Sequence, residues 1–78
     1  MAQFFLPVID LEASGKRLEQ LRKKNKLSVK DIQEQLGLSA QAVSKWRTGK
    51  SIPSTDNLLA LSVIFKVHME DLLVYKGR

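Results

Sequence analysis

Two short helical segments joined by a glycine-containing turn constrain the fold more than any other feature of this sequence. Ser28 is suited to cap the first segment because Asp31 follows it in the first turn, and Gly37 stops that segment. Only one residue then precedes Ser39, which opens the second segment, and Gly49 closes it. Such a short turn holds the second helix across the first, which is the geometry of a helix-turn-helix.

The residues before and after this pair also predict helices. A segment at 12–25 carries Leu18 and Leu21 on one helical face, with Ser14 as its candidate N-cap. After a loop that contains Pro53, two more helices are predicted.

Ser54 or Thr55 can cap a helix at 56–66, and a last short helix is predicted at 69–74, where His68 stands at the capping position. The chain therefore predicts an all-α bundle of five short helices. Only residues 4–9 have the character of a strand.

The sequence divides into three parts, the first of which is an apolar N-terminal arm. An arm at 1–13 precedes a helical domain at 14–75, and a tail occupies 76–78. The arm is not expected to be a signal peptide, because it has no early positive region and a proline interrupts it. No apolar run reaches the roughly 18 residues of a membrane span, so a cytoplasmic protein without a membrane association is expected.

Charge and composition limit the possible functions. The net charge is +5 with a pI near 9.8, which is typical of a small domain that meets a polyanion such as nucleic acid, although plain solubility is the simpler alternative. The chain has no cysteine and a single histidine, so the usual metal sites are not expected. No set of Ser, His and acid and no glycine-rich phosphate loop is present, so neither an enzyme nor a cofactor is expected.

The only tryptophan, Trp46, is interpreted as a core residue. On a helical wheel of residues 40–48, it falls in one arc with Ala42 and Val43. A stacking platform for single-stranded bases would need more aromatic residues along a shared groove.

The opposite arc of the same helix is the candidate site. It holds short, uncharged hydrogen-bonding side chains and one lysine, whereas a merely solvated face usually carries Glu and Lys. Gln can pair with adenine, Lys can reach guanine, and Ser serves several bases. No acidic residue occurs from Gln35 to Thr55, where Lys45, Arg47 and Lys50 lie.

A long stretch of the sequence resembles a known protein family. The stretch "RLEQLRKKNKLSVKDIQEQLGLSAQAVSKWRTGKSIPSTDNLLALSVIFKVHMEDLL" is similar to the phage repressor and Cro-like, or XRE-type, helix-turn-helix domains, and the resemblance covers roughly residues 15–74. The resemblance implies a five-helix repressor-like bundle whose third helix enters the DNA major groove. It implies base contacts by Ala40, Gln41, Ser44 and Lys45, and phosphate contacts by Ser28, Thr48 and Lys50.

The sequence departs from that family at three positions. Val29 and Ala40 stand where many relatives have glutamines that brace each other, which suggests a different readout, such as contact with a thymine methyl. Arg47 stands where relatives often have a glutamate that pairs with the first-helix arginine, here Arg22. Two facing guanidiniums repel, so at least one is expected to turn outward, and Arg47 is a candidate phosphate contact.

The interpretation is a sequence-specific duplex-DNA-binding transcriptional regulator without a small-molecule effector. The main alternative is a protein-interaction module, such as an antitoxin-type partner of another protein. The segment 57–65, "NLLALSVIF", favours that alternative, because a helix that is apolar on nearly every side is either fully buried or meets a partner.

A weak homodimer is also a hypothesis. Phe4, Phe5 and Leu6 are too apolar to lie freely in water, and relatives of this family commonly bind two half-sites as dimers. The alternative is an arm folded back over the fourth helix of its own chain.

Overall fold

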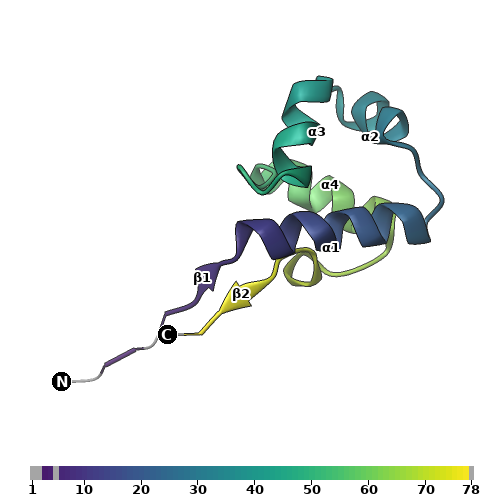
Figure 1. Cartoon of the computed structure of the whole chain (residues 1–78). Helices are drawn as coiled ribbons and strands as arrows, with labels where there is room; N and C mark the ends of the chain where they lie inside the picture. The colour runs from purple at the N-terminus through teal and green to yellow at the C-terminus, as the bar shows by residue number, and fades with distance from the viewer. Residues whose placement is uncertain (1–2, 5, 78) are drawn as a thin grey trace.

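The computed structural model describes residues 3–4 and 6–77, and four α-helices dominate it (Figure 1). A short strand precedes the helices, and a 3-10 helix and a second strand follow them. In chain order the elements are β1 (Val8–Ile9), α1 (Leu11–Lys24), α2 (Val29–Leu36), α3 (Ala40–Arg47), α4 (Thr55–Phe65), η1 (Met69–Leu72) and β2 (Tyr75–Lys76).

The caps of the middle helices are those the sequence predicts. The Ser28 side chain accepts from the backbone N–H of Asp31, whose carboxylate accepts in turn from the N–H of Ser28. Gly37 ends α2 with a left-handed φ of 64°, a conformation that glycine adopts without steric cost. Ser39 caps α3, and Ser54 rather than Thr55 caps α4.

The predicted cap of the first helix is wrong. Asp10 is the N-cap of α1, and its carboxylate accepts from the N–H of Ala13 at 3.0 Å. Ser14 lies inside the helix and is fully buried. Its hydroxyl donates to the carbonyl of Val74 at 3.1 Å and accepts from the Val74 N–H at 2.8 Å, so this serine fastens the C-terminal segment to α1.

The expected fifth α-helix is also wrong, because Met69–Leu72 forms a single 3-10 turn. His68 stands at the start of this turn as expected, and its N–H donates to the Asp71 carboxylate at 3.2 Å. The chain then becomes extended and forms β2, which pairs antiparallel with β1. The all-α class is confirmed, with four α-helices in place of five, and this two-stranded ribbon is added to it. Its strand β1 lies in the one segment that has strand character.

The four helices enclose one core. Its buried members include Leu61 and Leu72, which are 1% and 0% exposed, and Ile32 of α2. Leu36, also expected to face inward, is half-buried against this cluster. The complete buried cluster is Leu18, Leu21, Ile32, Val43, Trp46, Leu58, Leu61, Phe65 and Leu72.

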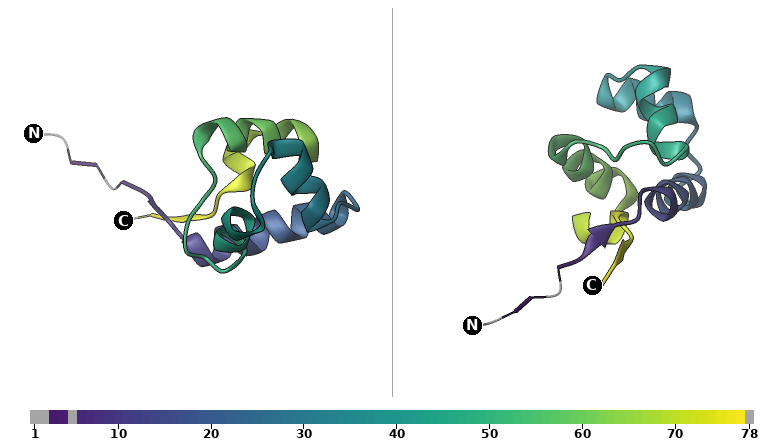
Figure 2. Two further views of the ribbon diagram at one scale, coloured as in Figure 1. Left: turned by 90° about the horizontal axis from the view of Figure 1, so that it is seen from above. Right: turned by 60° about the vertical axis from the view of Figure 1, so that its left-hand side comes forward.

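The helix α4 is neither fully buried nor covered by the arm. Its inner face lies in the core, but Leu59 and Val63 are 56% and 72% exposed. The described part of the arm does not fold back over α4, since residues 3–4 and 6–9 extend away from the helices in all three views (Figures 1 and 2). Phe4 and Leu6 are accordingly exposed, and Phe5 lies outside the described residues.

A close approach between α1 and α3 fixes the position of α3. A Cβ placed on Gly15 would overlap the backbone carbonyl oxygen of Trp46, so only glycine allows this crossing distance. The C-terminal end of α3 is held in the same region, because a Cβ on Gly49 would lie 3.0 Å from the Cα of Glu12. The residues Ser14 and Gly15 thus let one helix turn of α1 contact both α3 and the C-terminal segment.

Candidate nucleic-acid interface

The two faces of α3 separate as the helical wheel predicts. Trp46 and Val43 are 7% and 3% exposed and belong to the core, so the interpretation of Trp46 as a core residue is confirmed. Ala42 beside them is half-buried. On the opposite face the predicted site residues are exposed, namely Ala40, Gln41, Ser44, Lys45 and Thr48.

Most of these exposed residues meet in one shallow, open depression. Gln41, Ser44, Lys45 and Thr48 line it together with Lys50 from the following loop. Ala40 stands at the start of α3 and does not line the depression. The structure therefore groups three of the four predicted base-reading residues with two of the predicted phosphate-binding residues.

The turn after α3 folds back to bring Lys50 beside the helix. The backbone N–H of Lys50 donates to the carbonyl of Lys45 at 2.9 Å, and the N–H of Ser51 donates to the same oxygen at 3.3 Å. Gly49 makes this turn possible with a φ of 74°. The side chains of Lys45 and Lys50 thus lie on the same surface although a turn separates them.

Two of the predicted phosphate contacts are also engaged in their own helix ends. The Thr48 hydroxyl donates to the Ser44 carbonyl at 2.9 Å, so it must rotate before it can donate to a phosphate. Ser28 lies at the start of α2, apart from the depression. Its oxygen accepts from the Asp31 N–H, and the neighbouring Asp31 carboxylate competes with any outside acceptor for the hydroxyl hydrogen.

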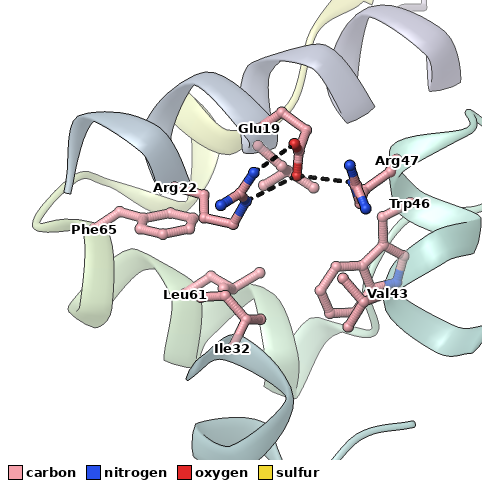
Figure 3. Close-up of a pocket in the computed structure, with 9 residues that line it drawn as sticks. Glu19, Arg22, Ile32, Val43, Trp46, Arg47, Leu61 and Phe65 are labelled. Carbon is pink, nitrogen blue, oxygen red and sulfur yellow. Dashed lines mark hydrogen bonds and ion pairs between the residues drawn. The ribbon is translucent and has the colours of Figure 1, made fainter. Parts of the chain in front are cut away.

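The expected repulsion between the two guanidiniums does not occur, because the carboxylate of Glu19 on α1 lies between them (Figure 3). The Arg47 side chain is 47% exposed all the same, and its role as a phosphate contact stays a prediction. Arg22 donates from Nε and Nη2 to the two carboxylate oxygens of Glu19, at 3.0 and 2.8 Å. Arg47 approaches Oε1 of the same carboxylate with its Nε at 3.2 Å. The Glu19 carboxylate thus pairs with two guanidinium groups.

The environment of Glu19 favours its ionised form. Its side chain is 20% exposed, and burial alone would favour the neutral acid. The hydrogen bond from Arg22, helped by the charges of Arg22 and Arg47, outweighs this effect and lowers the pKa of the Glu19 carboxyl. Glu19 therefore stays charged at neutral pH and ties α1 to the last turn of α3.

Sequence reasoning missed the role of Glu19, although part of the signal was present. Glu19 and Arg22 are three apart on one helix, a spacing at which opposite charges pair. Nothing local indicates that Arg47 joins them, because that contact depends on how α3 crosses α1.

The described part of the chain offers no group of three or more His, Cys, Asp or Glu residues that could hold a metal ion. Its helices are all too short, or too polar, to cross a membrane.

Comparisons with known proteins agree with this geometry. A helix-turn-helix family model matches residues 18–72 of the chain. The HTH-type transcriptional activator BcrR of Enterococcus faecalis is 38% identical over 59 residues, which are 76% of this chain. They are only 29% of BcrR, so the chain spans less than a third of that relative.

Solved structures show the same fold. The restriction-modification controller protein C.AhdI from Aeromonas hydrophila has a TM-score of 0.70 and 28% identity, over 81% of this chain and 96% of that one. The DNA-binding domain of BldD has a TM-score of 0.66 and 21% identity, over 83% of this chain and 94% of that domain, and shows the fold alone.

Proposed function

Because the chain belongs to the XRE-type helix-turn-helix family, a family of DNA-binding transcriptional regulators, we propose that it binds duplex DNA sequence-specifically with α3 in the major groove. One observation carries the proposal. The outer face of α3 is exposed, free of acids and lined by small hydrogen-bonding side chains, while Trp46 and Val43 anchor its inner face. The major groove admits a helix of this kind and displays a distinct pattern for each base pair.

The proposed base contacts follow from the chemistry of the four side chains. Gln41 suits adenine and Lys45 suits guanine, whereas the Ser44 hydroxyl is compatible with several bases. The methyl group of Ala40, at the start of α3, suits the methyl group of a thymine. Because Ser44 and Lys45 share a depression with Gln41, a few adjacent base pairs would be read together.

Phosphate contacts are proposed around this centre. Lys50 lies next to Lys45 and can reach the backbone beside the groove, and Thr48 and Arg47 end the same helix. Ser28 would contact the backbone from the start of α2, where helix N-termini favour anions. The acid of Asp31 beside it weakens that preference, so Ser28 is the smallest of these contributions.

The named relatives support regulation of transcription, since one is a transcriptional activator and another a restriction-modification controller protein. We propose that this chain acts in the cytoplasm, where bacterial DNA lies, and without a small-molecule effector. No enzymatic chemistry is proposed.

The decisive experiment is selection of bound sites from a random duplex library, followed by salt titration on the selected site. A shared motif is expected, and binding should weaken with a log–log slope of about −0.9 per neutralised phosphate. If no motif emerges and the salt titration is flat, the proposal of sequence-specific DNA binding is wrong.

A weak homodimer through the arm is a further part of the proposal. Phe4 and Leu6 are 79% and 68% exposed, and Val8, Ile9 and Tyr75 of the ribbon are exposed as well. Single exposed apolar residues are ordinary, but a contiguous group of them is typical of a protein interface. The fold-back alternative leaves Phe4 and Leu6 covered, which the described arm contradicts.

Sedimentation tests the homodimer. The full chain and a variant lacking residues 1–8 are compared, with Leu59→Ser as a control that alters an apolar residue elsewhere. The full chain and the control should associate weakly, more strongly on DNA, and the shortened variant should not. Monomers throughout, with one-to-one binding to a non-palindromic site, would refute the dimer.

The exposed Leu59 and Val63 also favour the alternative of a protein-interaction module, such as an antitoxin-type partner of another protein. The two functions are compatible, because α3 and α4 present different outer faces. A chain that binds a protein but shows no salt-dependent binding to duplex DNA would make the interaction module the correct function.

A further inference from the structure

We propose that Glu19 is a positioning residue for DNA binding, which holds Arg47 so that its two terminal nitrogens face a DNA phosphate. The inference rests on the proposed function. It concerns a residue of α1 that lies outside the depression and acts through Arg47 rather than by touching DNA.

The two arginines that share Glu19 are not equivalent. All three nitrogens of Arg22 are engaged, because Nε and Nη2 bind Glu19 and Nη1 donates to the Leu27 carbonyl at 2.6 Å. The Arg22 side chain is only 15% exposed. Arg22 therefore has a structural role in joining α1 to the start of α2.

Arg47 makes fewer contacts than Arg22 and is more exposed. Among the residues that the structure describes, Glu19 is its only ion-pair partner, and the nearest nitrogen to the carboxylate is Nε, at 3.2 Å. A guanidinium carries five N–H donors in a planar fork, and four of them are on the two terminal nitrogens. The side chain is 47% exposed, so these donors are accessible to a ligand.

The place of Arg47 on α3 fits a phosphate rather than a base. It lies on the wheel between the buried Val43 and the outer face, at the margin of the helix. A helix in the major groove presents its centre to base edges and its margins to the backbones that border the groove. Paired terminal nitrogens bind phosphate oxygens bidentately, which makes orientation as important as charge.

The net charge of Glu19, Arg22 and Arg47 also favours binding of an anion. Two guanidiniums and one carboxylate leave a local charge of one positive unit. Without Glu19, Arg47 would face an unpaired Arg22 and would have to be ordered at the moment of binding. Ordering a flexible side chain at an interface weakens binding by about 3- to 10-fold, which sets the size of the expected effect.

The test compares affinities for the selected duplex at several salt concentrations. Glu19→Gln is the main variant, and Glu12→Gln is its matched control. Both substitutions remove one negative charge from α1, but among the residues placed in the structure Glu12 pairs only with Lys16, and both side chains are exposed to solvent. Glu12→Gln should bind as well as the wild type or slightly better, because the protein becomes more positive. Glu19→Gln should bind about 3- to 10-fold more weakly in spite of the same charge change.

Two further variants exclude a purely structural effect. Arg47→Lys keeps the charge and loses the fork at an exposed position, so it should weaken binding to a similar extent without affecting the fold. Adding Glu19→Gln to Arg47→Lys should then cause no further loss. Each affinity is referred to the active fraction from a stoichiometric titration, so partial unfolding does not contribute.

The inference is overturned if Glu19→Gln binds as tightly as Glu12→Gln, if Arg47→Lys binds like the wild type, or if the two losses multiply in the double variant. Failure of the proposed function is a separate result. In that case the wild-type protein itself would show no salt-dependent binding to duplex DNA.

Discussion

The helices α3 and α4 lie in the same core but present opposite kinds of outer face. Both are anchored by large side chains, Trp46 in α3 and Leu61 in α4. The outer face of α3 carries small polar groups and lysine, whereas that of α4 exposes Leu59 and Val63. The difference shows that exposure by itself does not define a site. The chemistry of the exposed face is the better guide, and we propose nucleic acid as the partner of α3 and protein as the alternative partner of α4.

The largest effect is expected at the inner face of α3. Trp46→Ala should lower the free energy of unfolding by about 3–5 kcal/mol, since it removes a large buried side chain and leaves a cavity. Denaturant unfolding measures this, with Val63→Ala on the outer face of α4 as the control, where a change within about 0.5 kcal/mol is expected. A stable Trp46→Ala protein that had lost only DNA affinity would show that the indole contacts DNA.

The next effect concerns the outer face of α3. Lys45→Ala should reduce binding to the selected site by about 1–3 kcal/mol and relax the preference at one base position. Leu59→Ala, on the outer face of α4, should leave DNA affinity unchanged at low protein concentration. Repeating the site selection with both variants measures affinity and preference together. An unchanged motif for Lys45→Ala would remove this residue from the base contacts.

A smaller effect, less dependent on DNA sequence, is expected at the loop residue that lines the depression. Lys50→Ala removes a proposed phosphate contact, so it should weaken binding about equally on all sequences and reduce the salt slope by about 0.9. Titrations on the selected duplex and on a scrambled duplex measure both quantities. Loss confined to the selected duplex would instead assign Lys50 to base recognition.

The smallest effect is the pH dependence of the unfolding free energy that Glu19, which ties α3 to α1, is expected to cause. The hydrogen bond from Arg22 lowers the pKa of Glu19 below its ordinary value of 4.5. The folded state thus binds this proton less readily than the unfolded state, so the stabilisation is complete above about pH 4.5 and is lost as pH falls below it. Unfolding free energies from pH 6 to 3 should decline less steeply in Glu19→Gln. An unchanged decline would show that Glu19 contributes nothing to acid sensitivity.

Local patterns in the sequence were sufficient to predict the helix-turn-helix. The caps at Ser28 and Ser39 and the stop at Gly37 each depend on residues within one helical turn, and the structure confirms them. The assignment of Trp46 to the core was also local, because a period of 3.6 residues separates two faces of a helix without reference to the rest of the fold.

Two of the errors arose where a local feature was outweighed by a distant one. Ser14 has the residue type of a cap, but Val74, 60 residues away, binds its hydroxyl, and Asp10 caps the helix. The short helix expected at 69–74 gave way to a 3-10 turn, since the residues after it pair with β1.

The sequence by itself determined where α2 and α3 begin and end and which face of α3 lies inward, because capping and periodicity act within one or two turns. Only the tertiary structure decided that Glu19 separates Arg22 and Arg47, because their approach depends on the crossing of α1 and α3 at Gly15. The strength of an interaction between charges depends on their distance, and here the packing of α1 against α3 sets that distance.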